Sequence, residues 1–233
     1  MGKILIIGGG AMGSAFSIPC LENNNLVTIT EPYNKIFIKN LTSKNKFHSS
    51  LNLNLPKKLK FMNYSKEIFK KRFDLIVIAL SLAGIDFIGK ELKDLSIRTP
   101  LLVLTKGLKY DKKKKKLLTI SDLLKKSFNV ANISVLKGPC LAKELAKKNK
   151  TSVIVANKNI KLAKWIGKLI STKYYLTEFS RDVIGVEICS AIKNIYAMVI
   201  GSGQNLNAKS DLFQKSVNAV SYTHLTLPTI YSV

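Results

Sequence analysis

The sequence predicts a doubly wound α/β domain with a mostly parallel sheet, followed by the start of an all-helical domain. Three observations support this fold class. Short runs of Val, Ile and Leu recur with helix-length intervals between them, a glycine-rich turn follows the first run, and a long amphipathic helix begins near residue 182. Strands that are apolar on both faces are typical of a parallel sheet covered by helices. With 233 residues, of which 46% are hydrophobic, the chain can bury the core of such a domain.

The expected elements alternate along the chain, as a parallel sheet requires. The strands share short apolar runs bounded by turn residues: 4–7, 26–30, 75–80, 101–104, 133–136 and 153–156. The helices between them share lysine-rich outer faces, and the clearest are residues 64–71, 84–95 and 116–126. We therefore expect the α/β domain to span residues 1–178.

A different pattern begins after residue 178. Apolar residues then recur at spacings of three and four, as on one face of a helix: Ile184, Ile188, Ala191, Ile195 and Met198. We expect residues 179–220 to begin a second, helical domain. Residues 221–233 fit neither pattern, because a helix expected over 210–220 passes abruptly into a threonine-rich apolar tail. A foreign or frameshifted end explains this tail, a short native C-terminal strand stays open, and we assign no function to His224.

The net charge of +24 raises the question of a nucleic-acid partner, because clustered Lys and Arg attract polyanions. Here the lysines are spread over the chain. The one dense run, Lys112 to Lys116, lies between a strand-like and a helix-like segment, where a solvated turn explains it. No aromatic-rich basic motif of the RNA-binding kind accompanies this run. We therefore expect no nucleic-acid partner, and a small anionic substrate also fits the charge.

Cysteine usage and hydropathy indicate a cytoplasmic protein. Cys20, Cys140 and Cys189 form an odd, widely spaced set without metal-ligand spacing, which argues against a disulfide framework and a metal site. The N-terminus could imitate a secretory signal, but three consecutive glycines and a proline directly before the cysteine argue against one. The best candidate for a membrane span, residues 188–200, carries Lys193 in its middle and is shorter than the ~18 residues required. We expect no integral membrane segment.

Gly8, Gly10 and Gly13 form a G-x-G-x-x-G turn directly after the first expected strand and at the start of the first helix. The first glycine permits the tight turn, the second lets a pyrophosphate approach the backbone, and the third lets the helix pack close to the strand. The N-terminus of the helix then offers free N–H groups and a partial positive charge to the phosphates. The pattern predicts a Rossmann-type site for an adenine dinucleotide. A flavin site and a glycine turn without a ligand are the alternatives.

Glu31 stands at the end of the second expected strand, about twenty residues after the glycine turn. A carboxylate at this place can accept hydrogen bonds from both ribose hydroxyls of adenosine and repel a 2′-phosphate. Glu31 therefore favours NAD over NADP. Lys35 and Lys39 are near enough in sequence to hold a 2′-phosphate, so NADP stays open.

Two lysines indicate where the chemistry takes place. Lys106 follows the strand of residues 101–104, and ligands of open α/β sheets bind at the carboxyl ends of the strands. The next strand ends in a turn at Gly138, whose backbone N–H groups would reach the same rim. Lys193 interrupts the most apolar helix, and we expect its amine close to Lys106, which would lower its pKa and make it a proton donor and acceptor. A lysine that extends to the surface is the alternative.

At these residues the chain resembles the NAD(P)-dependent glycerol-3-phosphate dehydrogenases. The order and spacing of the matching segments agree across roughly residues 1–219, and the last two segments are specific to that family. The matching segments are residues 8–15 (GGGAMGSA), 105–108 (TKGL), 138–145 (GPCLAKEL) and 182–187 (DVIGVE), the last leading to 191–194 (AIKN).

The resemblance implies an oxidoreductase that transfers a hydride between NAD(P)(H) and glycerol 3-phosphate or dihydroxyacetone phosphate, linking glycolysis to glycerophospholipid synthesis. It implies that Lys193 is the general acid and base, and that Lys106 binds substrate and stabilises the transition state. The remaining implied contacts are with the substrate, through Gly138, Cys140 and Asn194, and with the dinucleotide, through Ala11, Met12, Lys106 and Ala142. We also consider a homodimer of the full-length form.

Two departures from the family pattern limit these implications. The family usually has Ser or Thr at the position of Cys140, so one hydrogen bond to the substrate is weakened here. The later helical segment of the family, whose Arg-Asn pair holds the substrate phosphate, has no counterpart, which indicates a truncated member of uncertain activity. Two alternatives therefore stay open: another two-domain reductase of the ketopantoate or imine type, and a non-catalytic fragment that binds NAD.

Overall fold

The computed structural model describes residues 1–33, 45–92, 98–112, 115–127 and 132–193. Asn194, the helix expected over 210–220 and the tail of residues 221–233 therefore lie outside the described residues, and so do Lys35 and Lys39. Within the described ranges, no helix combines the length and the apolar character needed to cross a bilayer.

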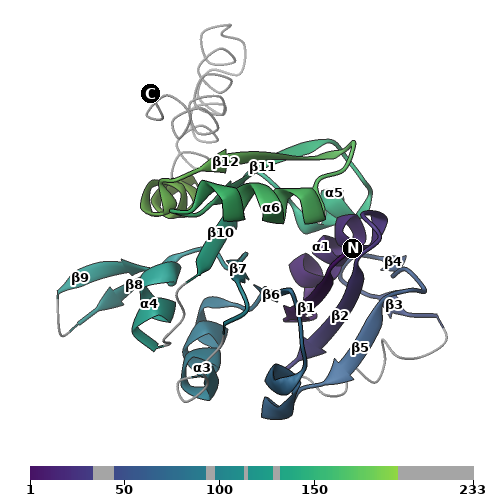
Figure 1. Cartoon of the computed structure of the whole chain (residues 1–233), viewed down its shortest axis with the longest axis horizontal. Coiled ribbons are helices and arrows are strands. Elements are labelled where there is room, and N and C mark those ends of the chain that lie inside the picture. Colours follow the sequence, from purple (N-terminus) through teal and green to yellow (C-terminus); the bar gives the residue numbers. More distant parts are fainter. Residues whose placement is uncertain (34–44, 93–97, 113–114, 128–131, 194–233) are drawn as a thin grey trace, which may run out of the picture.

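One eight-stranded sheet organises the fold, with the strand order β12-β11-β10-β7-β6-β1-β2-β5 (Figure 1). The strands are β1 (Lys3–Ile7), β2 (Leu26–Glu31), β5 (Lys60–Asn63), β6 (Leu75–Ile78), β7 (Leu101–Val103), β10 (Ile133–Lys137), β11 (Thr151–Ala156) and β12 (Tyr175–Ser180). Neighbouring strands run parallel except at β10 and β11, which pair antiparallel. The prediction of a mostly parallel, doubly wound sheet is confirmed.

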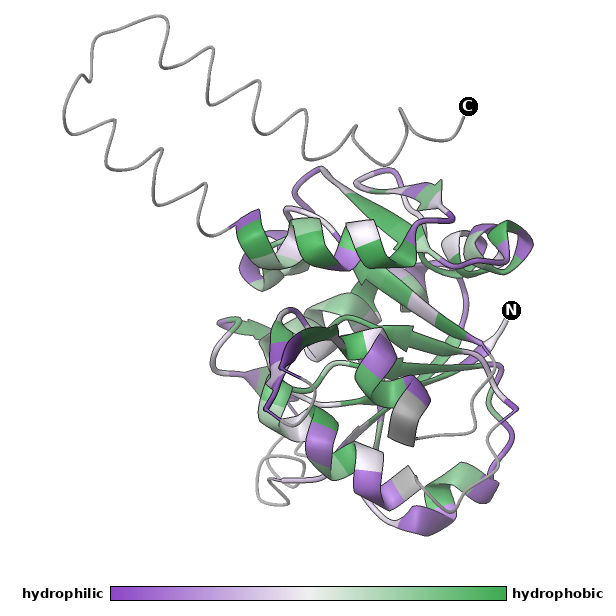
Figure 2. Ribbon diagram, turned by 90° about the vertical axis from the view of Figure 1, so that its left-hand side faces the viewer, coloured by the Kyte–Doolittle hydropathy of each residue, from purple (hydrophilic) through white to green (hydrophobic). Residues whose placement is uncertain are grey.

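Two apolar clusters cover the two faces of the sheet, and the alternation of side chains along β1 separates them. Ile4 and Ile6 belong to one cluster, while Leu5 and Ile7 belong to the other, and all four are fully buried. Alternate residues of a strand point to opposite faces, so β1 is an interior strand of a sheet that is covered on both sides. Figure 2 shows the apolar strands between helices whose outer surfaces are partly polar.

The helices divide between the two faces according to the cluster that each one completes. Helices α1 (Ala11–Glu22) and α6 (Ile160–Ile170) bury Phe16 and Ile166 in the first cluster. Helices α3 (Leu82–Leu92) and α4 (Ile120–Ser127) bury Ile88 and Leu124 in the second. The 3₁₀ helix η1 (Lys66–Lys70) and the short helix α5 (Ala142–Ala146) complete the connections. The layers match the covered sheet that the apolar strands predict.

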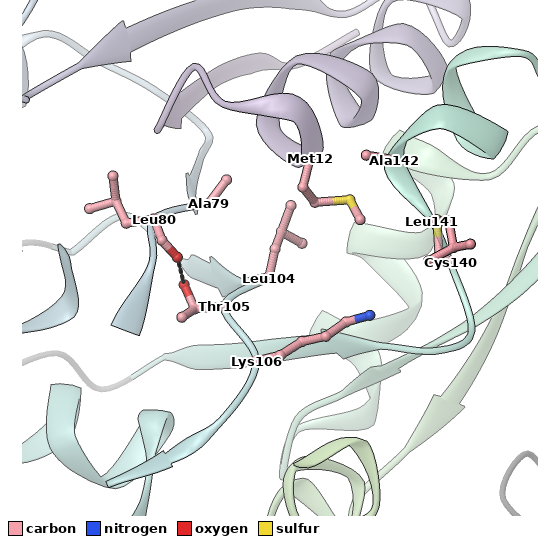
Figure 3. Close-up of a pocket in the computed structure, with 9 residues that line it drawn as sticks. All are labelled: Met12, Ala79, Leu80, Leu104, Thr105, Lys106, Cys140, Leu141 and Ala142. Carbon is pink, nitrogen blue, oxygen red and sulfur yellow. Dashed lines mark hydrogen bonds between the residues drawn. The ribbon is translucent and has the colours of Figure 1, made fainter. Parts of the chain in front are cut away.

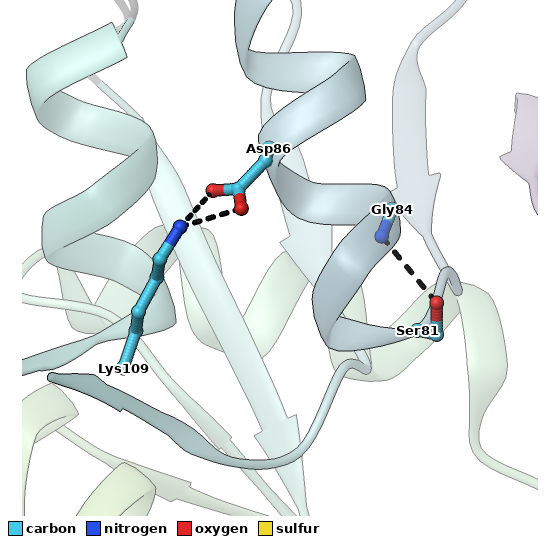
Figure 4. Close-up of polar contacts among 4 residues, drawn as sticks. All are labelled: Ser81, Gly84, Asp86 and Lys109. Carbon is cyan, nitrogen blue, oxygen red and sulfur yellow. Dashed lines mark hydrogen bonds and ion pairs between the residues drawn. The ribbon is translucent and has the colours of Figure 1, made fainter.

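A β-hairpin replaces part of the helix expected over residues 116–126, so that prediction is wrong at its first four residues. Strand β9 (Lys116–Thr119) pairs antiparallel with β8 (Leu108–Asp111), and α4 begins only at Ile120. The hairpin lies against α3 through the ion pair between Lys109 and Asp86, and Figure 4 also shows the N–H of Gly84 directed at the hydroxyl of Ser81. A run of lysines shows neither the helical nor the strand periodicity of apolar residues. The local structure here therefore depends on the pairing of β9 with β8.

The described residues of the lysine-rich run, Lys112, Lys115 and Lys116, are exposed, as expected of a solvated run. Lys115 has a positive φ of 48°, a conformation typical of tight turns. The sequence analysis missed β5, β12 and the short pair β3 (Phe47–His48) and β4 (Leu53–Asn54). Strand β12 alternates buried and exposed residues at the sheet edge, and such a short amphipathic pattern is a weaker signal than a continuous apolar run.

A last helix follows β12 and covers residues 183–193 of the described chain. Val183 and Val186 are buried in the second apolar cluster, while Ile184 and Ile188 are 52% and 40% exposed. The helix therefore packs on the α/β domain through a face other than the one that carries Ile184 and Ile188. The division of the chain at residue 178 stays a prediction.

Candidate functional site

The glycine turn joins β1 to α1, and the backbone of the helix comes very close to the end of the strand. Gly8 has a φ of +112°, a conformation that L side chains rarely adopt, and its N–H donates to the carbonyl of Thr30 at 2.8 Å. A Cβ placed on Gly13 would lie 2.0 Å from the oxygen of Gly8, so only glycine lets the helix lie this close to the strand. A Cβ on Gly10 would meet nothing within 4 Å. The two outer glycines therefore serve the fold, and Gly10 faces open space.

The start of α1 fits the phosphates of a dinucleotide. The helix begins at Ala11, and its N-cap is Gly10, which has no side chain to accept from the first N–H groups. Ala11 and Met12 are only partly buried, and the first N–H groups of a helix have no acceptor within the helix. A pyrophosphate requires open space beside the backbone and free N–H groups at a helix N-terminus. The space at Gly10 and the uncapped start of α1 meet both requirements. The residues present therefore fit the cofactor that the sequence predicts.

Glu31 is the last residue of β2, as the sequence predicts, and it is tied to the glycine turn. It is buried, with 9% of its surface exposed. Oε2 accepts from the N–H of Gly9 at 2.8 Å, and Oε1 accepts from the N–H of Tyr33 at 3.0 Å. Each carboxylate oxygen retains capacity for a further donor, so these bonds orient Glu31 without using up its acceptors. The ribose contact remains a prediction.

His48 contacts the glycine turn, and the sequence analysis missed it. Its ring is buried, and Nδ1 accepts from the N–H of Leu51 at 3.3 Å, which leaves Nε2 as the donor to the carbonyl of Gly9 at 3.2 Å. The hydroxyl of Ser14 donates to the same carbonyl at 2.7 Å. The backbone N–H and carbonyl of Gly9 are thus held by the side chains of Glu31, Ser14 and His48. No signal in the sequence pointed to His48, because it lies in a two-residue strand far along the chain from the turn.

A pocket lies between the start of α1 and the ends of β6, β7 and β10, and Figure 3 shows the Lys106 amine extending into it. It brings together predicted residues from three separate segments, namely Met12 from the glycine turn, Lys106, and Cys140 with Ala142. The full lining consists of Met12, Ala79, Leu80, Leu104, Thr105, Lys106, Cys140, Leu141 and Ala142. Its walls are mostly apolar, with one amine, which suits a nicotinamide ring beside a small anionic substrate.

Lys106 is exposed at the pocket, and its amine lies 3.4 Å from the carbonyl oxygen of Gly138. Partial removal from water and the charge of Lys193 lower the pKa of Lys106 to about 8. The two amines therefore interact, although 86 positions separate them in the sequence. The expected proximity of these two lysines is present in the structure.

Lys193 lies at the end of the described part of the last helix and is partly buried. Asn194, which the resemblance places at the substrate, is outside the described residues. The catalytic role of Lys193 therefore rests on its position beside Lys106 and stays a proposal. Among the residues that the structure describes, no group of three or more His, Cys, Asp and Glu side chains could hold a metal ion.

The turn after β10 brings backbone and a thiol to the pocket. A Cβ on Gly138 would lie 2.8 Å from the carbonyl oxygen of Ser152, so the close passage of β11 requires glycine there. Cys140 is buried, and burial raises the pKa of its thiol to about 11. At neutral pH it is a protonated, weak hydrogen-bond donor rather than a nucleophile. Its contact with substrate stays a prediction.

Comparisons of the sequence with known proteins show which enzyme family it matches. The sequence pattern of the family described as "NAD-dependent glycerol-3-phosphate dehydrogenase N-terminus" matches residues 3–163. A glycerol-3-phosphate dehydrogenase [NAD(P)+] of Fusobacterium nucleatum is 29% identical over 229 residues, which cover 95% of this chain and 67% of the relative. The chain thus spans about two thirds of the length of that relative.

Solved structures agree with the fold. The structure of glycerol-3-phosphate dehydrogenase from Coxiella burnetii superposes with a TM-score of 0.78 at 21% identity, covering 99% of this chain and 70% of that one. A structure described as a 2-dehydropantoate 2-reductase from Enterococcus faecalis reaches a TM-score of 0.55 at 19% identity, covering 80% of this chain and 60% of that one. At these identities the likenesses show the fold alone.

Proposed function

Because the chain belongs to the NAD-dependent glycerol-3-phosphate dehydrogenase family, we propose that it interconverts glycerol 3-phosphate and dihydroxyacetone phosphate with a nicotinamide dinucleotide. The observation that carries the proposal is the proximity of Lys193 to Lys106, whose side chain lines the same pocket as Met12. One residue comes from the glycine turn, one from a strand end and one from the last helix. In this proposal the three residues would serve the cofactor, the anionic substrate and the proton transfer.

The dinucleotide fits along the glycine turn, where Gly10, Ala11 and Met12 would contact its phosphates and Glu31 its adenosine ribose. When bound, it supplies or accepts the hydride at C4 of the nicotinamide. Glu31 favours NAD over NADP, because a second negative charge beside this buried carboxylate is repelled.

The two amines divide the remaining chemistry. In the reducing direction, Lys193 as an ammonium gives its proton to the C2 oxygen of the ketone and becomes a neutral amine; in the oxidising direction it takes that proton back. Lys106 holds positive charge beside the same oxygen and stabilises the negative charge that develops there. A pKa of about 8 lets Lys106 remain mostly charged at neutral pH while it stays close to a second cation.

The physiological setting is part of the proposal. We infer a cytoplasmic enzyme that links carbohydrate metabolism to glycerophospholipid synthesis. Cys20 and Cys140 form no disulfide within the described part of the chain, which suits a reducing compartment. A homodimer of the full-length form and the lack of a nucleic-acid partner stay predictions.

The first experiment measures cofactor binding and turnover on the same preparations. Isothermal titration with NADH gives the affinity, and NADH oxidation with dihydroxyacetone phosphate gives kcat. Lys193→Ala should lower kcat about a hundredfold or more, because it removes general acid catalysis, and should leave the affinity for NADH within about twofold. Lys164→Ala, at an exposed position of α6, is the matched control and should change neither quantity.

The outcomes distinguish the proposed dehydrogenase from the two alternative functions. Unchanged turnover in Lys193→Ala removes Lys193 from the mechanism. Turnover of ketopantoate or an imine, without turnover of dihydroxyacetone phosphate, would assign the pocket to another class of two-domain reductase. Binding of NADH by the chain without turnover of any substrate in the panel would support a non-catalytic dinucleotide-binding protein.

A further inference from the structure

Besides Lys106 and Lys193, a further lysine close to the pocket is buried, and neither the resemblance nor the proposed chemistry assigns it a role. Lys137 is the last residue of β10, and only 4% of its surface is exposed. Burial of an ammonium is unfavourable unless hydrogen bonds or opposite charge compensate for it. The Nζ of Lys137 donates to the carbonyl oxygen of Thr105, the residue immediately before Lys106.

The contacts of Lys137 and Lys106 are reciprocal. Lys137 donates to the carbonyl beside Lys106, and Lys106 donates to the carbonyl of Gly138, the residue immediately after Lys137. The hydroxyl of Thr105 donates in turn to the carbonyl of Leu80 at 2.8 Å. These three bonds connect the carboxyl ends of β6, β7 and β10 across the floor of the pocket.

The charges around Lys137 link it to the helix that carries Lys193. Burial lowers the pKa of Lys137 to about 8, the negative charge of Glu187 acts to raise it, and the positive charge of Lys106 acts to lower it. Glu187 lies on the helix of residues 183–193, is 1% exposed, and accepts from the N–H and the hydroxyl of Ser121. Lys137 is therefore subject to the charge of the Glu187 carboxylate and donates to the backbone beside Lys106.

We propose that Lys137 is a positioning residue for Lys106, an inference that rests on the proposed role of the Lys106 amine at the substrate. By holding the carbonyl of Thr105, Lys137 fixes the segment from which the Lys106 side chain extends into the pocket. Without this bond the segment after β7 is free to turn, and the amine moves from the pocket wall toward water. A buried group that fixes a functional side chain in this way supports the preorganisation of a site.

The test measures the pKa of Lys106 directly by competitive acetylation with acetic anhydride as a function of pH, read out peptide by peptide by mass spectrometry. Only neutral amines react, so a rise of one pKa unit lowers the rate at neutral pH about tenfold. In Lys137→Met, which keeps the length of the side chain without its donors or charge, the acetylation rate of Lys106 at pH 7 should fall about tenfold or more. Lys147→Met, at an exposed lysine beyond α5, is the matched control and should leave it unchanged.

An unchanged rate at Lys106 in a folded Lys137→Met protein overturns the proposal. If that variant does not fold, the wild-type chain alone still decides, because a buried donor to Thr105 predicts that the neutral amine of Lys137 is acetylated at least about tenfold more slowly than that of Lys147. The two rates are compared at the plateau of each pH profile, and similar plateau rates at Lys137 and Lys147 would contradict the buried contact. Titration of the wild-type chain with NADH and with dihydroxyacetone phosphate separates the two proposals, because failure to bind them refutes the function and leaves the acetylation result intact.

Discussion

At the scale of single residues, the glycine turn shows how one motif combines two physical requirements. Gly13 is needed because a side chain there would collide with the backbone of Gly8, 2.0 Å away, before any ligand is present. Gly10 is surrounded by open space, so the folded chain itself does not need glycine at that position. The difference is explained if the space above Gly10 belongs to the cofactor.

A pair of alanine substitutions tests this division. Gly10→Ala should leave the free energy of unfolding within about 0.5 kcal/mol and weaken NADH binding about tenfold or more, because the new methyl group occupies the place of the pyrophosphate. Gly13→Ala should lower the free energy of unfolding by about 1–3 kcal/mol, because the helix must move away from the strand. Urea denaturation and NADH titration of both variants give the two quantities. Equal loss of stability in both variants would contradict the division.

At the scale of elements, the apolar strands were the predictable part. Strands β1, β6, β7 and β10 consist mostly of apolar residues because both of their faces are covered, and this composition can be recognised in the sequence. The β8–β9 hairpin was not predictable from the same rule, since its residues alternate weakly and its partner strand supplies the stabilisation. The predicted start of the helix in this lysine-rich segment was therefore wrong, since α4 begins at Ile120.

The contact between α4 and the last helix is also an element-scale feature, and it predicts a loss of stability in a serine variant. The N-terminus of α4 is tied to the helix of residues 183–193, because Ser121 donates its N–H and its hydroxyl to Glu187. Ser121→Ala removes one donor from a buried carboxylate and should lower the free energy of unfolding by about 1–3 kcal/mol. Ser49→Ala, at an exposed serine, is the control and should change it by less than about 0.5 kcal/mol. Equal unfolding midpoints in urea for Ser121→Ala and the wild type would show that this contact contributes nothing.

At the scale of the whole molecule, the topology explains which parts of the site could be predicted. Parallel strands bring their carboxyl ends to one edge, so Lys106 and the turn at Gly138 could be placed together before the structure was known. His48 and Lys137 could not, because their roles depend on contacts made through burial rather than on any motif. A lysine that directly follows an apolar strand was the one available signal for Lys137.

The central claim is that the glycine turn and the two lysines Lys106 and Lys193 serve one ligand pocket. The most direct test is a crystal structure of the chain with NADH, in which the distances from the Nζ atoms of Lys106 and Lys193 to C4 of the nicotinamide are measured. The account predicts the pyrophosphate over Gly10 and both amines facing the same side of the nicotinamide ring, close enough for one small substrate to contact all three. A dinucleotide bound elsewhere, or a Lys193 amine directed into bulk solvent away from the ring, would contradict it.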